Sequence, residues 1–118
     1  MATHNETGKT GENLAAAWFT SNGYNIIHQN WRYKNLEVDI IAHRNNCLHF
    51  IEIKATTTLK FGHPETKVTP KKIKHLIDAS EAYLYQYPQW QRIQFDVLAI
   101  TILPNSNPQY FYIEDVYL

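Results

Sequence analysis

Acidic residues recur at short spacing in two stretches whose other residues favour β-strands. The segment from 35 to 55 reads NLEVDIIAHRNNCLHFIEIKA and carries Glu37 and Asp39 in the first stretch, then Glu52 and Lys54 in the second. Carboxylate oxygens are ligands that Mg²⁺ prefers, and a site with one or two carboxylates leaves room for water and phosphate oxygens. These residues could therefore support metal-assisted hydrolysis, provided that the fold brings the acids together.

The turn between the two stretches decides how the acids meet. An Asn-Asn pair at positions 45–46 tolerates the positive φ angles that a two-residue hairpin turn requires. With this pair as the loop of an antiparallel hairpin, Asp39 lies directly opposite Glu52, and Glu37 lies opposite Lys54. Side chains alternate between faces along a strand, so all four are predicted to project from one face.

Directly opposed carboxylates repel each other. Two such charges about 4 Å apart repel by about 4 kcal/mol at an effective dielectric constant near 20. Lys54 relieves part of this repulsion, and a divalent cation such as Mg²⁺ or Mn²⁺ between Asp39 and Glu52 would relieve more. The alternative interpretation is a ladder of ion pairs at a wet sheet edge, where water screens the charges.

The rest of the chain predicts an α/β fold with the order αβββαβ, one late strand and a central mixed sheet flanked by helices. Apolar periodicity predicts the helices, β-branched and aromatic runs predict the strands, and Gly23 and the Thr69-Pro70 pair mark helix boundaries. The predicted elements are a helix at 10–22, strands at 24–33, 36–44 and 47–54, a polar connection at 55–68, a helix at 70–87, a buried strand at 92–102 and a short strand after 109.

Composition places the chain among ordinary globular proteins. Its 118 residues are predicted to form one domain over 1–118, with 1–6 as a loose terminus. The single cysteine, Cys47, excludes an internal disulfide framework and favours a cytoplasmic location. The longest apolar runs are too short to span a membrane, so no membrane association is expected.

Charge is balanced overall but uneven along the chain. The formal net charge is zero, which argues against a uniformly basic surface. Positive charge instead gathers between positions 54 and 74, where Glu65 is the only acid before the helix interior. This segment indicates either a local nucleic-acid contact or a solvated loop and helix start; its lysines are Lys54, Lys60, Lys67, Lys71, Lys72 and Lys74.

An acid on one strand followed by Glu-x-Lys on the next, within an αβββαβ order, resembles the PD-(D/E)xK nuclease superfamily, whose fold is restriction-endonuclease-like. The full motif set resembles the YraN-like family, also called UPF0102, which is similar in fold to archaeal Holliday-junction resolvases. The resemblance covers residues 8 to about 100 and rests on Gly11-Glu12, Gly23-Tyr24, Asn30-Trp31-Arg32, Glu37-Val38-Asp39, Phe50-Ile51-Glu52-Ile53-Lys54 and Phe61-Gly62-His63-Pro64.

The resemblance implies a role for each acidic-motif residue. It makes Asp39 and Glu52 the ligands of Mg²⁺ or Mn²⁺, and Lys54 the residue that positions or deprotonates the attacking water. Glu12, on the first helix, matches the position from which a third acid faces the metal. Glu37 is expected beside these ligands in a supporting role.

The implied activity is metal-dependent endonucleolytic hydrolysis of DNA, on a branched or flapped structure. The basic residues expected to hold the DNA backbone are Arg32, Lys60, Lys71, Lys72 and Lys74. Such contacts give an affinity that does not depend on sequence and falls with salt. The same interpretation allows a homodimer.

Two departures from the family pattern support a different class of function. Family members usually carry glycine where this chain has Leu36, and arginine where it has Thr56. Together with the zero net charge, Thr56 favours a non-catalytic nucleic-acid-binding or assembly module that retains the nuclease fold. Both functions stay open on the sequence alone.

Overall fold

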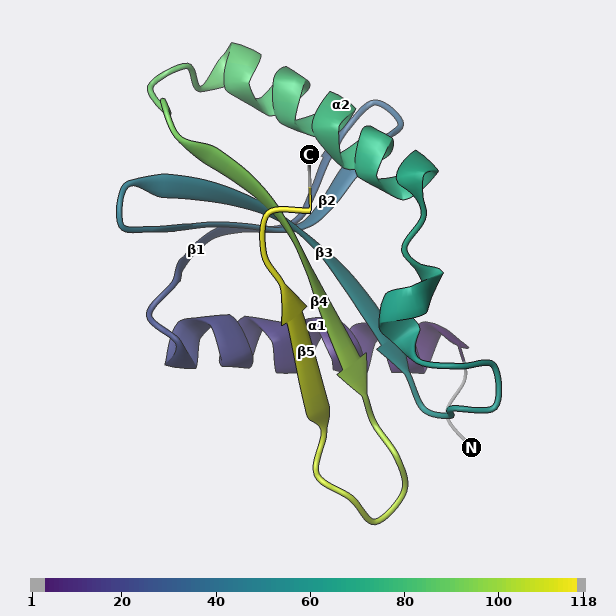
Figure 1. The fold of residues 1–118 in the computed structure, drawn as a ribbon. Coiled ribbons are helices and arrows are strands. Elements are labelled where there is room, and N and C mark those ends of the chain that lie inside the picture. The colour runs from purple at the N-terminus through teal and green to yellow at the C-terminus, as the bar shows by residue number, and fades with distance from the viewer. Residues whose placement is uncertain (1–3, 117–118) are drawn as a thin grey trace.

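A computed structural model describes residues 4–116 and confirms the predicted α/β order with its late strand (Figure 1). The elements are α1 (His4–Ser21), β1 (Asn25–Tyr33), β2 (Leu36–Arg44), β3 (Cys47–Thr56), the 3-10 turn η1 (Pro64–Lys67), α2 (Pro70–Gln86), β4 (Ile93–Thr101) and β5 (Gln109–Ile113). None of the helices in this part of the chain is long and apolar enough to cross a membrane.

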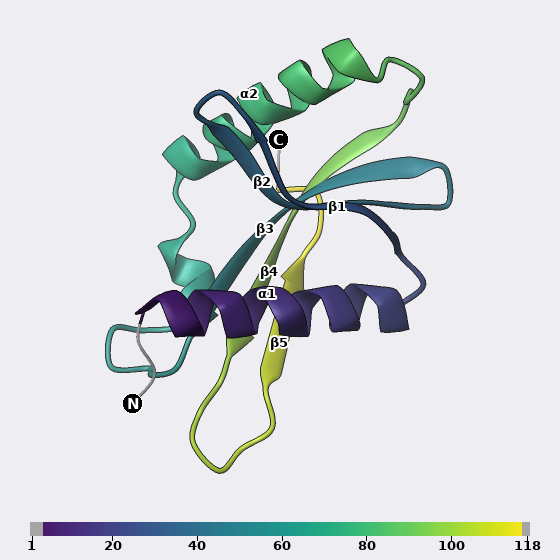
Figure 2. The same cartoon turned by 180° about the vertical axis from the view of Figure 1, so that it is seen from behind.

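Five strands form one mixed sheet in the order β1-β2-β3-β4-β5. The central pair β3–β4 is parallel and the other neighbours are antiparallel. Helices α1 and α2 cover opposite faces of the sheet, as the front and back views show (Figures 1 and 2). The predicted central mixed sheet flanked by helices is therefore confirmed.

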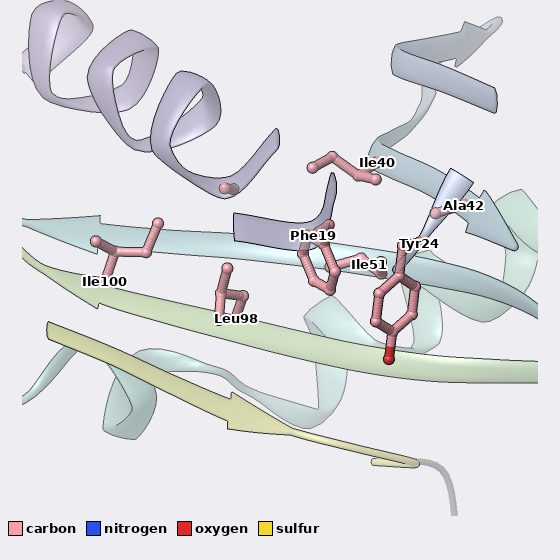
Figure 3. Close-up of a cluster of buried hydrophobic side chains, with 8 residues drawn as sticks. Phe19, Tyr24, Ile40, Ala42, Ile51, Leu98 and Ile100 are labelled. Atoms are coloured by element: carbon pink, nitrogen blue, oxygen red, sulfur yellow. The ribbon is translucent and has the colours of Figure 1, made fainter. Parts of the chain in front are cut away.

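Each face of the sheet has its own apolar core. Beneath α1, Phe19 packs with Tyr24, Ile51 and Leu98, all of them almost completely buried (Figure 3). Beneath α2, a second cluster gathers around the buried ring of Tyr83. Burying a large apolar side chain stabilises a fold by roughly 1.5–3 kcal/mol, so these clusters fix the helices on the sheet.

The local turn and cap predictions hold. Asn45 and Asn46 both have positive φ angles, of 53° and 61°, as a two-residue hairpin turn requires. Gly23 ends α1 with φ 84°. The Thr69 side chain caps α2 by accepting a hydrogen bond of 3.2 Å from the backbone N–H of Lys72.

Helix α1 begins earlier than the apolar pattern predicted. The expected loose terminus at 1–6 is wrong for residues 4–6, which are helical, and residues 1–3 lie outside the described part of the chain. The apolar stripe that predicts this helix begins only at Leu14, so it carries no signal for the preceding turns. A helix can extend by a turn or two without apolar contacts, and Glu6 in its first turn interacts favourably with the helix dipole.

A buried polar network on β4 was not predicted. The Asp96 carboxylate is fully buried and lies 2.6 Å from Nδ1 of His49; it accepts hydrogen bonds from the Tyr112 hydroxyl (2.6 Å), the Gln94 amide (2.9 Å) and the Asp115 backbone N–H (2.9 Å). Burial alone would raise the pKa of Asp96, but these hydrogen bonds outweigh it and hold the pKa below its usual value. The network ties the chain after β5 to the sheet.

Gly11 sets how closely α1 approaches the sheet, and we predict that Gly11→Ala destabilises the protein. A Cβ atom at this position would lie 2.6 Å from Cβ of Ala55 on β3, far inside van der Waals contact. Because overpacking of this kind costs about 1–3 kcal/mol, the free energy of unfolding in urea should fall by that amount.

Gly8→Ala is the matched control on the same helix. No atom lies within 4 Å of a Cβ added at Gly8, so the change should raise the free energy of unfolding by up to about 1 kcal/mol. Equal effects of the two substitutions would show that close packing at Gly11 is not a constraint.

Candidate active site

The site forms where β2 and β3 separate. Their ladder confirms the predicted hairpin register from Arg44–Cys47 to Ile40–Ile51 and ends there. The predicted backbone pairing of Asp39 with Glu52, and of Glu37 with Lys54, is therefore wrong. In its place, Oδ2 of Asp39 accepts a hydrogen bond of 2.8 Å from the backbone N–H of Ile53. This carboxylate takes the place of a backbone acceptor at the point of separation.

A break in β1 accompanies this separation. Asn30 has φ 54°. The register of the β1–β2 ladder sets Asn30 opposite Asp39, but the ladder omits both residues. On the two sides of Asp39, Val38 packs in the cluster under α2 and Ile40 in the cluster under α1. Residues two apart in a regular strand share a face, so the strand turns over at Asp39 and the predicted alternation of faces fails there.

The separated strands and the start of α2 enclose a hollow of about 580 Å³. Its polar lining joins three predicted acids to predicted lysines and consists of Asn35, Glu37, Asp39, Glu52, Thr69, Lys71, Lys72 and His75. The acids thus meet at one place although the β2–β3 ladder ends before it reaches them. The arrangement offers carboxylate oxygens on the sheet side and ammonium groups on the helix side.

The two central carboxylates hold their protons more tightly than usual. Burial, the charge of Glu52 and smaller repulsions from Glu37 and Glu12 raise the pKa of Asp39 to about 7, against the opposing hydrogen bond from Ile53. Burial also raises the pKa of Glu52, although Lys72 and Lys54 partly counter it. Perturbed carboxyl groups of this kind are typical of functional sites, and also of structural charge networks.

Lys54 contacts Lys72 of the acidic hollow and lines a second hollow. A hydrogen bond with Lys72, partial burial and the positive charge of Lys72 lower the pKa of Lys54. The neighbouring Lys72 is therefore the main cause of this shift. Lys54 lines the second hollow, of about 370 Å³, together with residues of the loop that follows β3.

Helix α1 brings Glu12 toward the same site. The Oε2 atom of Glu12 accepts a hydrogen bond of 3.3 Å from the Asn30 side chain, next to the break in β1. The charge of Glu12 contributes to the raised pKa of Asp39, so the two carboxylates interact. Glu12 thus lies near enough to act on Asp39 through its charge, although it does not line the acidic hollow.

The five predicted DNA-contacting residues differ in their surroundings. Lys71 and Lys72 line the acidic hollow. Lys74 instead forms an ion pair of 3.3 Å with Asp78, and Arg32 forms one of 3.2 Å with Glu37. Lys60 lies on the loop after β3, with Nζ 5.7 Å from the ring centroid of Phe61.

Sequence reasoning missed Asn35, Thr69 and His75 as lining residues. His75 lies one helical turn beyond Lys71, and its spacing from Lys71 and Lys72 places the three on one side of α2. That spacing is the signal in the sequence that could have included His75 in the site. Asn35 lies in the turn between β1 and β2, where no sequence feature pointed to the site.

The carboxylates of the acidic hollow suit a divalent cation only if water or phosphate oxygens complete its ligand shell. In the region from residue 4 to residue 116, no three His, Cys, Asp or Glu side chains are grouped closely enough to hold one metal ion. Asp39 and Glu52 nevertheless supply two partly buried carboxylates whose charges a cation would compensate. Mg²⁺ accepts one or two carboxylates with water and phosphate oxygens completing its shell, so these two residues suit such an ion.

The fold resembles that of a solved archaeal resolvase. The chain superposes on the structure of Archaeoglobus fulgidus Hjc, described as a Holliday junction resolvase from an archaeal hyperthermophile, with a TM-score of 0.51. The match covers 87% of this chain and 74% of that one at 14% sequence identity, so the likeness concerns the fold.

Residues 11–100 match the family described as "Uncharacterised protein family UPF0102", and the chain belongs to this family. A UPF0102 protein of Flavobacterium johnsoniae is 43% identical over 118 residues, covering 97% of this chain and 93% of the relative. One of Phocaeicola vulgatus is 42% identical over 108 residues, covering 92% and 88%. The family resemblance drawn from the motifs is thereby confirmed.

The raised pKa of Asp39 predicts that Asp39→Asn stabilises the metal-free protein at alkaline pH. An aspartate in the unfolded chain titrates near 3.9, so between about pH 4 and pH 7 the folded state holds a proton that the unfolded state has released. The free energy of unfolding of the parent therefore decreases as pH rises through this window. Asparagine cannot ionise, and its side-chain oxygen can still accept the Ile53 N–H.

Urea unfolding in EDTA at several pH values measures the effect. The variant should exceed the parent by about 1 kcal/mol or more at pH 8, equivalent to roughly one pKa unit, and the difference should shrink toward pH 4. A variant that is less stable than the parent at pH 8 would make Asp39 a structural residue.

Proposed function

We propose that this chain is a metal-dependent endonuclease that hydrolyses DNA phosphodiester bonds. The observation that carries the proposal is the pair of partly buried carboxylates, Asp39 and Glu52, facing lysines across one hollow. The fold shared with a resolvase supports it. Oxygen ligands for a cation and ammonium groups for phosphate are the two requirements of phosphodiester hydrolysis.

Asp39 and Glu52 would hold Mg²⁺ or Mn²⁺. When bound there, the ion supplies Lewis-acid stabilisation of the phosphate oxygens and lowers the pKa of a bound water. The hydrogen bond from Ile53 fixes one oxygen of Asp39 and leaves the other available as a ligand. Because each raised pKa reflects burial and like charge, both carboxylates gain from a positive ion between them.

Lys54 would position the attacking water and accept its proton. The neighbouring Lys72 lowers the pKa of Lys54, which increases the fraction of neutral amine near neutral pH. A general base works best when its pKa lies close to the working pH. Lys54 therefore suits this role better than an isolated lysine would.

Glu12 and Glu37 would shape the field around the two ligands. Glu12 reaches the site from α1 and is oriented by its hydrogen bond with Asn30. Glu37 lines the hollow and forms an ion pair with Arg32, and this pair keeps the Arg32 guanidinium beside the site. Both add negative charge near Asp39, and this favours a divalent ion.

The DNA backbone would lie along the start of α2. Lys71 and Lys72 face the hollow and suit the phosphates next to the scissile bond, while Lys60 and Arg32 extend the contact on either side. A branched or flapped DNA in the cytoplasm is the proposed substrate. A homodimer would present two such sites to the strands of a branched molecule.

A second candidate is a non-catalytic nucleic-acid-binding or assembly module. It is favoured by the lack of a grouped set of three metal-ligating side chains among the described residues, and by threonine at position 56. Such a module would bind its ligand without a divalent cation. The nuclease would need Mg²⁺ or Mn²⁺ for cleavage.

The deciding experiment incubates the pure protein with linear, nicked, flapped and four-way DNAs, with and without Mn²⁺. We predict metal-dependent cleavage of at least one branched or flapped DNA. Glu52→Gln should reduce the cleavage rate by about a hundredfold or more, near 2.7 kcal/mol of transition-state stabilisation, because it removes a ligand charge.

Glu81→Gln is the matched control, since Glu81 is an exposed acid on α2 outside both hollows. Its rate should equal that of the parent. Binding without metal and no cleavage of any DNA would favour the second candidate.

Glu12→Gln in the same assay should reduce the cleavage rate at least about tenfold if Glu12 acts at the site, a change of about 1.4 kcal/mol.

The lysines of α2 give a prediction about binding. Lys71→Ala should weaken affinity for every DNA sequence and reduce the slope of log K against log salt by about 0.9, the value for one lost phosphate contact. Lys74→Ala should have a smaller effect, because its ammonium is already paired with Asp78. Fluorescence anisotropy at several salt concentrations measures both, and equal slopes for parent and Lys71→Ala would place the DNA elsewhere.

A further inference from the structure

An exposed aromatic ring lies at the second hollow, the one that Lys54 lines. Phe61 is on the loop between β3 and η1, and 69% of its surface is exposed. Figure 1 shows this loop beyond the end of β3, beside the N-terminal part of α1. Single exposed apolar residues are common on protein surfaces, so the significance of Phe61 depends on what surrounds it.

The loop holds Phe61 in a defined turn. The Thr56 hydroxyl donates to the carbonyl of Thr58 (2.8 Å), and the Thr58 hydroxyl accepts from the N–H of Lys60 (3.1 Å). The N–H of Gly62 then closes the turn on the carbonyl of Leu59 at 3.0 Å. Gly62 has φ 95°, a conformation that other residues rarely adopt. The ring is therefore presented by a hydrogen-bonded loop.

The lining of this second hollow differs from that of the acidic one. Among the described residues, no acidic side chain lines it. It combines the ammonium groups of Lys54 and Lys67 with the hydroxyl-bearing run Thr56–Thr58 and the ring of Phe61. Its volume of about 370 Å³ lies within the range typical of small-ligand sites, about 300–1,000 Å³.

These groups match the three parts of a nucleotide. Ammonium groups bind a phosphate, hydroxyls hydrogen-bond to phosphate and sugar oxygens, and an exposed aromatic ring stacks on a base of any type. Lys60, whose Nζ lies 5.7 Å from the Phe61 ring centroid, adds positive charge at the rim. Charge and shape together favour a single strand of nucleic acid over an apolar partner.

We propose that the second hollow binds one unpaired nucleotide of the DNA, with its base stacked on Phe61 and its phosphate facing Lys67. This proposal rests on the proposed nuclease function, since Lys54 lines this hollow and contacts Lys72 of the acidic one, which places this nucleotide next to the scissile phosphate. It makes DNA with unpaired bases at a branch or flap the preferred substrate class.

The physical reason for this preference is the cost of exposing a base. In a fully paired duplex the base must be unstacked and unpaired before it can reach the ring, which costs a few kcal/mol. An unpaired base at a flap has already lost that pairing. Stacking on an aromatic side chain then contributes to affinity only for DNA that already carries an unpaired base.

The test measures dissociation constants by fluorescence anisotropy in EDTA, for one duplex with and without an unpaired flap. Phe61→Ala should weaken binding of the flapped DNA by about fivefold to a hundredfold, as expected for the loss of one stacked base. For the duplex without a flap, Phe61→Ala should change the logarithm of the dissociation constant by less than about a third as much. Phe61→Trp should retain the preference for the flap, because tryptophan also stacks.

Phe111→Ala is the matched control, since Phe111 is 53% exposed but lies on β5 and lines neither hollow. A 2-aminopurine in the flap adds a direct signature, because stacking on Phe61 should quench its fluorescence in the parent and not in Phe61→Ala. The proposal is overturned by equal losses on both DNAs, by no loss, by a similar loss in Phe111→Ala, or by a parent that binds neither DNA.

Cleavage in Mn²⁺ on the same two DNAs separates this proposal from the nuclease proposal. Flap-selective binding that depends on Phe61, with no cleavage by the parent, would retain the nucleotide site and reject the nuclease. Cleavage by the parent with identical binding by Phe61→Ala would retain the nuclease and reject the nucleotide site.

Discussion

The hydrogen bond from the Ile53 backbone N–H to the Asp39 carboxylate is the contact on which the whole site depends. It gives the Ile53 N–H of β3 an acceptor at the point where the ladder with β2 ends. The two strands can therefore separate without leaving this backbone donor unpaired. The separation opens the hollow that the start of α2 lines with lysines. It also buries Asp39 among other acids, and this raises its pKa.

Two aspartates of the sheet show how partners decide the state of a buried acid. Asp96 is fully buried, yet hydrogen bonds from His49, Tyr112, Gln94 and the Asp115 backbone keep its pKa low, so it stabilises the fold as a carboxylate. Burial and negative neighbours raise the pKa of Asp39, and the one such donor that it has, the Ile53 N–H, does not outweigh them. The first environment is satisfied within the protein. The second environment leaves the negative charge of Asp39 poorly compensated within the protein, and perturbed carboxyl groups of this kind cluster at functional sites.

The charge distribution around Lys54 divides the site into two parts. On one side lie Asp39 and Glu52, and on the other lies a hollow with lysines, threonine hydroxyls and the ring of Phe61. Lys72 belongs to the acidic side but lowers the pKa of Lys54, so it links the two. A chain with no net charge can therefore present strongly different local potentials, and overall charge was a poor guide to its surface.

The sequence by itself determined the features that depend on local preference. The Asn45-Asn46 turn, the Gly23 stop, the Thr69 cap and the hairpin register near the turn follow from the conformations that each residue tolerates. The motif spacing also singled out Asp39, Glu52 and Lys54 as candidate site residues, and the structure brings Asp39 and Glu52 to one hollow. Only the tertiary structure decided that the strands separate at Asp39, that β1 breaks at Asn30, that His75 joins the hollow and that Asp96 is buried in a network. These features arise from contacts between segments distant in sequence, and no local pattern encodes which partners tertiary packing will bring together.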